Sequence, residues 1–168
     1  VKVDVARMMA RKDGIVAKMT KGIEFLFRKN KIVWLKGHGR LAGSKDGRFV
    51  IEVSGEGESV SCDAAQVIIA TGSKARHLPG LAVDNQIVCD NEGALSLGAA
   101  PKRLGVIGSG VIGLELGSVW RRLGSEVTIL EALPEFLAAA DEAVRKEAWK
   151  QFTRQGLKIH LGATLGEV

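Results

Sequence analysis

The stretch that decides the fold is RLGVIGSGVIGLELGSVWRRLGSEVTILE, residues 103–131. It starts with an apolar run, 104–107, of the length of a short buried strand. Three glycines follow in the spacing GxGxxG, and the apolar residues behind them repeat at helical intervals to about Leu123. A second apolar run, 127–130, ends on Glu131. The pattern predicts a strand, a glycine turn, a helix and a second strand, in that order.

The spacing of the three glycines matches the geometry of a dinucleotide-binding turn. Gly108 permits the tight turn from strand to helix, Gly110 has no Cβ to block a pyrophosphate, and Gly113 lets the helix pack close to the strand. The pyrophosphate would lie on the unpaired amides at the positive end of the helix. Glu131 lies where the second strand delivers a carboxylate to the ribose hydroxyls of the adenosine.

The residues around Glu131 indicate which nicotinamide cofactor the site prefers. The Glu131 carboxylate would repel a 2′-phosphate, and residues 132–134 supply no arginine to neutralise one. NAD is therefore favoured over NADP. Because glycine accounts for 21 of the 168 residues, a GxGxxG by itself could be an ordinary glycine-rich turn. The strand before it, the helix after it and the acid at the end of the next strand favour the dinucleotide site over that alternative.

The composition is that of an ordinary α/β protein, with 46% apolar and 26% charged residues. No apolar run approaches the about 20 residues needed to cross a bilayer, and residues 1–14 lack the apolar core of a signal peptide. We therefore expect a cytoplasmic protein with no membrane span. Residues 1–48 carry 13 Lys and Arg against 4 Asp and Glu, but these charges surround an amphipathic helix and form no nucleic-acid motif. We expect no nucleic-acid partner, and a solvated face or a surface for an acidic partner instead.

The two cysteines and three histidines give no sign of a metal site. Cys62 and Cys89 are too few and too far apart for a metal cluster or a disulfide scaffold, and their apolar surroundings predict buried, reduced thiols. His38, His77 and His160 each lack a carboxylate at a spacing that suggests a catalytic dyad. We expect all three histidines to be structural.

The first hundred residues predict a helix followed by an antiparallel meander. Asp4 is a suitable N-cap for an amphipathic helix that ends near Asn30. Two runs, 32–35 and 67–69, are apolar throughout and predict strands buried on both faces. The other expected elements are turns at 36–39 and 43–47, meander strands at 49–53 and 59–62, a short helical piece at 91–97, and a domain boundary at 98–102.

The residues after Glu131 continue the alternation of helix and strand. Asp141 is expected to cap a helix that reaches about Gln155, with Gly156 as the residue that ends it. The run 157–161 predicts a third strand. These elements complete one βαβαβ half of a mononucleotide-binding sheet.

The chain resembles the flavin-dependent pyridine nucleotide disulfide oxidoreductases along essentially its whole length. The resemblance rests on KGHGRL at 36–41, VIIATGS at 67–73, ALSL at 94–97 and above all the long glycine motif. It implies an α/β fold made of two three-layer, Rossmann-like dinucleotide-binding units, both incomplete, with an antiparallel β-meander in the first. Residues 1–100 would be the C-terminal part of an FAD-binding domain, and 101–168 the first βαβαβ half of an NAD-binding domain.

The resemblance also assigns cofactor contacts. It places Val111 and Ile112 beside the nicotinamide, Glu115 where it orients that ring against the flavin, and Leu165 near the adenine. The implied NAD residues are Gly108, Ser109, Gly110, Val111, Ile112, Gly113, Glu115, Glu131 and Leu165, and the implied FAD residues are Gly39, Thr71, Gly72 and Ser73.

Within the family, the resemblance is greatest to the branch that reoxidises dihydrolipoamide, carried on a lipoyl domain of a multienzyme complex, with NAD. It implies a homodimer; mercuric reductases are a competing branch, and glutathione reductases are disfavoured by their NADP preference. The family's redox CxxxxC and catalytic His-Glu pair have no counterpart in the 168 residues. We therefore expect no catalytic residue here and no activity from the chain alone. A stand-alone NAD-binding module and a partner-docking piece are the alternatives.

Overall fold

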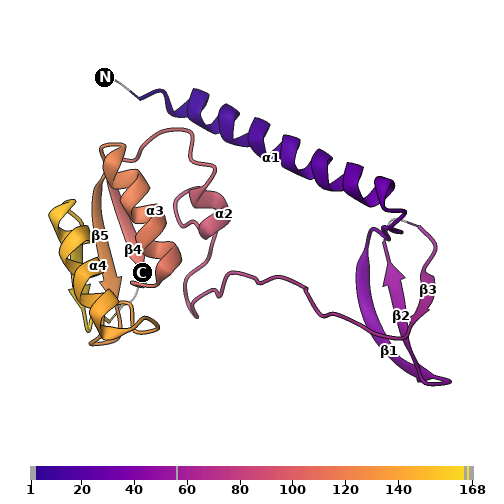
Figure 1. Ribbon diagram of the computed structural model, residues 1–168. Coiled ribbons are helices and arrows are strands. Elements are labelled where there is room, and N and C mark those ends of the chain that lie inside the picture. The colour runs from indigo at the N-terminus through magenta and orange to yellow at the C-terminus, as the bar shows by residue number, and fades with distance from the viewer. Residues whose placement is uncertain (1–2, 56, 165, 167–168) are drawn as a thin grey trace. The chain divides into compact units, whose positions relative to one another are not determined.

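The computed structural model describes residues 3–55, 57–164 and 166, and these residues form two compact units. The parallel-sheet unit combines the described residues of 1–12 with those of 75–168, and the antiparallel-sheet unit contains those of 13–74. Figure 1 shows the elements of each unit along the chain. The α/β class predicted from the sequence is confirmed. No helix among the described residues is long and apolar enough to span a membrane.

The parallel-sheet unit is built from alternating strands and helices. Its strands are β4 (Arg103–Ile107), β5 (Glu126–Glu131) and β6 (Lys158–Leu161), hydrogen-bonded in the order β4-β5-β6 and all parallel. Helix α3 (Val111–Arg122) connects β4 to β5, and α4 (Glu142–Arg154) connects β5 to β6. The predicted βαβαβ alternation is confirmed. Because parallel strands require such crossovers, the carboxyl ends of all three strands meet at one edge of the sheet.

Local signals in the sequence set the ends of α4. The Asp141 side chain accepts a hydrogen bond of 2.9 Å from the amide of Ala143, as an N-cap does. Gly156 adopts a φ of +90°, the left-handed conformation that ends many helices. The predicted helix from Asp141 to about Gln155 is therefore confirmed to within a residue at each end.

The core of this unit lies around the central strand. Val127 and Ile129 of β5 are completely buried, and Leu114 of α3 and Leu157 before β6 pack against them. Ala148 and Phe152 of α4 pack against the same cluster, so both helices cover a common apolar surface. Each fully buried side chain of this size contributes roughly 1.5 to 3 kcal/mol. Burial of β5 thus fixes where its last residue, Glu131, leaves the sheet.

The antiparallel-sheet unit is the predicted meander with tighter turns. Its strands are β1 (His38–Lys45), β2 (Arg48–Ser54) and β3 (Val60–Ala64), in that order in the sheet. The turn expected at 43–47 is shorter in the structure, because Gly43 belongs to β1 and only Asp46 and Gly47 separate the paired residues Lys45 and Arg48. Both turn residues have positive φ, 51° and 74°, as a two-residue type I′ hairpin turn requires.

Helix α1 (Val5–Lys29) and the short helix α2 (Asn91–Ala94) also match predicted elements. The Asp4 carboxylate accepts from the Arg7 amide at 3.0 Å, which confirms it as a cap of α1. No residue of α1, all of which the structure describes, is buried. Helix α2 is shorter than the predicted piece 91–97, and Asp90 caps it by accepting from the amides of Glu92 and Gly93.

Two predicted buried strands are wrong. The runs 32–35 and 67–69 belong to no strand of the described chain, and their apolar side chains are exposed, to 81% at Val33 and 90% at Ile68. An apolar run becomes a strand only when neighbouring strands satisfy its backbone and other elements cover its faces. Among the described elements, no strand pairs with either run.

Two smaller expectations also need correction. The turn expected at 36–39 ends earlier, since His38 and Gly39 already pair within the meander; Gly37 alone has a positive φ, 153°. Cys62 lies on β3 and is exposed, while Cys89 is half-buried, so neither thiol is in the buried setting predicted. Cys62 is exposed because β3 lies at the edge of a sheet in which most residues are solvent-accessible.

The close approach of α3 to β4 predicts a sharp cost for adding one methyl group. A Cβ at Gly113 would lie 2.6 Å from the carbonyl oxygen of Gly108 and 3.1 Å from Val106 Cγ1. Gly113→Ala should therefore lower the free energy of unfolding by about 1 to 3 kcal/mol, measured by urea denaturation followed by circular dichroism. Gly105→Ala, whose Cβ would meet nothing within 4 Å, is the matched control and should be neutral or slightly stabilising. Equal losses from both variants would contradict this account.

Candidate functional site

The glycine turn between β4 and α3 is held to the neighbouring strand by its backbone. Gly108 has a φ of +98°, which a residue with a side chain adopts only with strain. Its amide donates a 2.8 Å hydrogen bond to the carbonyl of Leu130, near the end of β5. The turn and the end of β5 are therefore one rigid piece, and this piece lies at the carboxyl edge of the sheet, where open parallel sheets bind ligands.

The glycine at position 110 is not required by the protein's own packing. Gly110 is the N-cap of α3 with a φ of −74°, an ordinary value for any residue, and a Cβ there would meet nothing within 4 Å. Gly113 is different, because the Gly108 carbonyl oxygen lies too close to the place that a Cβ would occupy. The space in front of Gly110 is therefore open to a group from outside the chain.

The N-terminus of α3 has the features of an anion site. The first hydrogen bond of the helix runs from the Leu114 amide to the Gly110 carbonyl at 3.0 Å, so the amides of 111–113 precede the helical ladder. Gly110 has no side chain with which to cap them. Val111 and Ile112, which follow, are exposed apolar residues on the same first turn. A diphosphate fits this end of the helix by charge and by space.

Glu131 at the end of β5 is an ionised carboxylate aimed back at the turn. Its Oε2 accepts from the Ser109 amide at 2.7 Å and from the Ser109 hydroxyl at 2.9 Å, and its Oε1 accepts from the Leu133 amide at 2.9 Å. The amides of Leu133 and Ser109, followed by the Ser109 hydroxyl, lower the pKa of Glu131 against an opposing effect of burial. Oε2 therefore accepts two hydrogen bonds and Oε1 accepts one, so Oε1 keeps the greater acceptor capacity.

Ser109 has an intramolecular partner in Glu131. The Ser109 amide and the Ser109 hydroxyl both donate to the Glu131 carboxylate. That Ser109 also contributes to NAD binding stays a prediction. The hydroxyl also accepts a 3.3 Å bond from the amide of Leu137. Sequence reasoning missed this bridge, because the partners are 22 and 28 positions away and no local pattern signals it.

The other predicted site residues lie in less defined surroundings. Glu115 is exposed, one turn into α3, and Leu165 lies outside the described residues. Gly39 pairs with Val53 in the meander. Residues 71–73 form an exposed, irregular segment in which Gly72 has a φ of +73°. The structure brings Ser109, Gly110 and Glu131 together; the predicted FAD residues occupy separate segments of the antiparallel-sheet unit.

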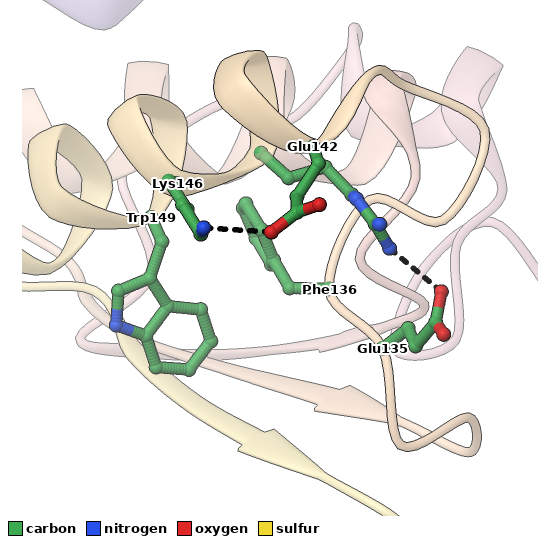
Figure 2. Close-up of a pocket in the computed structure, with 6 residues that line it drawn as sticks. Glu135, Phe136, Glu142, Lys146 and Trp149 are labelled. Carbon is green, nitrogen blue, oxygen red and sulfur yellow. Dashed lines mark hydrogen bonds and ion pairs between the residues drawn. The ribbon is translucent and has the colours of Figure 1, made fainter.

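A shallow depression beside α4 is distinct from the glycine turn. Figure 2 shows Phe136 and Trp149 against it, with rings 5.2 Å apart in an edge-to-face arrangement. Its charged rim is internally paired, Arg145 with Glu135 at 2.6 Å and Lys146 with Glu142 at 2.6 Å. These contacts join the loop after β5 to α4. They support the loop that carries Leu133 and Leu137 rather than present free charges to a ligand.

The chain matches a family of known proteins along nearly its whole length. Residues 2–168 match the family profile described as pyridine nucleotide-disulphide oxidoreductase. The chain belongs to this family. Members of the family are FAD-dependent and use NAD(H).

Curated relatives of the chain include dihydrolipoyl dehydrogenases. The enzyme of that name from Cupriavidus necator is 67% identical over all 168 residues, and dihydrolipoyl dehydrogenase 3 of Pseudomonas putida is 49% identical over 95% of the chain. The chain spans 35% and 34% of those proteins, about a third of their length. The crystal structure of LpdA from Mycobacterium tuberculosis superposes with a TM-score of 0.85 over 97% of this chain and 36% of that one; at 24% identity it supports the fold alone.

The lowered pKa of Glu131 predicts a pH-dependent contribution to stability. Because the folded value lies below the ordinary value of 4.5, the contribution is fully present above pH 4.5 and is lost as the pH falls through the folded pKa. Glu131→Gln should therefore unfold at a lower temperature than the unchanged chain at about pH 7. The gap should close on acidification below about pH 4.5, as measured by circular dichroism melts. A gap that stays constant down to about pH 3 would contradict the assignment.

Proposed function

We propose that this chain is part of an FAD-dependent oxidoreductase that oxidises dihydrolipoamide with NAD, and that residues 103–131 bind the NAD. One observation carries the proposal: the uncapped N-terminus of α3 lies next to an ionised carboxylate, whose Oε1 accepts one hydrogen bond and Oε2 two. A dinucleotide carries both complementary groups, an anionic pyrophosphate and ribose hydroxyls, in one molecule. The names of the relatives support the substrate.

The roles of the individual residues follow from their places in the turn. The pyrophosphate would lie in the open space before Gly110, against amides of the first turn of α3. A ribose hydroxyl would donate to Glu131 Oε1, the carboxylate oxygen with fewer hydrogen bonds. Val111 and Ile112 are exposed apolar surface suited to the nicotinamide, and Glu115 would orient that ring. Leu165 is proposed as an adenine neighbour on the resemblance alone.

The same proposal places FAD contacts in the other unit. Gly39 and residues 71–73 are proposed to meet the FAD, because their exposed backbone would allow a close approach. The division into an FAD-binding part, 1–100, and an NAD-binding part, 101–168, belongs to this proposal. Bound FAD and NAD would supply the hydride-transfer chemistry, and the residues of this chain would position them.

Charge favours NAD over NADP at this site. Glu131 is ionised at neutral pH and faces the position of the adenosine ribose, where NADP carries a 2′-phosphate. Two unit charges of like sign about 4 Å apart repel by roughly 1 to 4 kcal/mol at a protein surface. Residues 132–134, Ala, Leu and Pro, offer no cation to offset that repulsion.

The chemical groups for disulfide exchange are not in this sequence. The only cysteines, Cys62 on β3 and Cys89 before α2, are 27 positions apart and do not form a CxxxxC pair. The proposed partner is dihydrolipoamide on a lipoyl domain of a multienzyme complex, and the proposed parent is a cytoplasmic homodimer. The sequence motif and the relatives support these proposals.

Binding of NADH is the direct test of the proposed site. Titration of NADH into the chain, followed by tryptophan fluorescence, should give saturable binding, and Gly110→Val should abolish it by filling the open space before the helix. Gly105→Val, whose added atoms also begin in open space but on β4, is the matched control and should bind normally. Absence of saturable binding to the unchanged chain would overturn the NAD assignment.

The absence of a CxxxxC pair predicts that the chain alone is inactive. A mixture of the chain, FAD, NAD and dihydrolipoamide should form no NADH above the rate without protein, measured by absorbance. The reason is that electrons would have no thiol pair through which to pass from the substrate to the flavin. Turnover by this chain would contradict the proposed division of labour.

A further inference from the structure

Ser109 connects three segments of the candidate site. The residue is only 1% exposed and lies between the glycine turn and the end of β5. The Ser109 hydroxyl donates to Glu131 Oε2 at 2.9 Å and accepts from the Leu137 amide at 3.3 Å. The Ser109 amide adds a 2.7 Å bond to the same carboxylate oxygen. The turn, the strand end and the loop at 132–137 therefore meet at one side chain.

The arrangement uses the full chemistry of a hydroxyl. A serine side chain has one O–H to donate and two lone pairs to accept, and here the proton goes to Glu131 while a lone pair receives the Leu137 amide. Alanine or glycine at 109 could offer neither bond. Leu137 has a φ of +48°, an uncommon value for leucine, so its loop is held in a conformation that needs external support.

The two bonds from Ser109 decide which carboxylate position is left for a ligand. Oε2 accepts both the amide and the hydroxyl of Ser109 and has no further lone pair to offer. Oε1 accepts one hydrogen bond at 2.9 Å, from the Leu133 amide, so the oxygen away from Ser109 is the one with fewer hydrogen bonds. Without the Ser109 hydroxyl, the Glu131 carboxylate could rotate, and its two oxygens would then accept hydrogen bonds from different groups.

We propose that Ser109 is a positioning residue, whose hydroxyl fixes the Glu131 carboxylate so that Oε1 accepts from the ribose and the site prefers a cofactor without a 2′-phosphate. The inference rests on the proposed NAD site and adds to it. Ser109 acts through Glu131 and does not itself touch the cofactor through its hydroxyl. It follows that the effect of Ser109 should exist only while the glutamate is present.

A double-mutant cycle measures this dependence. The dissociation constants of NADH and NADPH are measured for the unchanged chain, Ser109→Ala, Glu131→Ala and the double variant. Ser109→Ala should weaken NADH binding about tenfold, the scale of one hydrogen bond to a charged group, and should change NADPH binding little. In the Glu131→Ala background, Ser109→Ala should have no further effect on either cofactor.

Ser125→Ala is the matched control. Ser125 is also a completely buried serine, at the opposite end of β5, and its hydroxyl has no hydrogen-bond partner among the described residues. Its replacement should leave NADH affinity unchanged. If Ser109→Ala loses its fold by circular dichroism, Ser109→Cys replaces it, since cysteine has the same branching and is somewhat larger, but is a much weaker donor.

A second measurement needs no cofactor. The groups acting on the pKa of Glu131 are the amides of residues 109, 132 and 133, the Ser109 hydroxyl and burial. Loss of the hydroxyl should raise that pKa toward its ordinary value, followed by carbon-13 NMR of the glutamate carboxyl. Ser125→Ala should leave the same titration unchanged.

The outcomes separate the two proposals. If the unchanged chain fails to bind NADH, the proposed function fails, while the NMR titration still tests the link between Ser109 and Glu131. If the unchanged chain binds NADH but Ser109→Ala keeps the same preference over NADPH, the positioning role is overturned. Equal losses from Ser109→Ala with and without Glu131 would overturn it as well, because they would show a general structural effect.

Discussion

The parallel-sheet unit depends on the direct contact between the backbone at Gly108 and the start of α3 at Gly113. The missing Cβ at Gly113 leaves room for the Gly108 carbonyl, which a methyl group would approach to 2.6 Å. This contact brings the first turn of α3 down onto the end of β4 and turns its free amides toward the edge of the sheet. Any larger residue would lift the helix away and move those amides.

The position of the glutamate follows from the same constraint. The Gly108 amide is bonded to Leu130, so β5 is fixed relative to the turn, and its next residue, Glu131, comes within reach of Ser109. The burial of Val127 and Ile129 prevents the strand from sliding, because a shift of one residue would expose both. Packing therefore sets the distance between the anion site and the acid, and the hydrogen bonds of Ser109 set the orientation of that acid.

The sequence predicted the features that depend on residues close together in the chain. The GxGxxG spacing, the Asp141 cap and the apolar run of β5 each act within a few residues, and the structure has the expected elements at those places. The bridge from Ser109 to Glu131 and Leu137 depends on segments far apart in the chain, so no pattern could indicate it. The same reason explains the error at 67–69: its composition favours a strand, but pairing depends on what else is folded beside it.

The exposed segment at 67–70, Val-Ile-Ile-Ala, has a consequence for handling the chain. Three consecutive β-branched residues and an alanine carry no charge and no proline, and Ile68 and Ile69 are 90% and 79% exposed. Segments of this kind pair with copies of themselves and promote aggregation unless neighbouring structure covers them. The isolated chain should therefore self-associate at high concentration through residues 67–70. Lys74 and Arg76 are the nearest charged residues on the C-terminal side, and charges flanking such a segment oppose its aggregation.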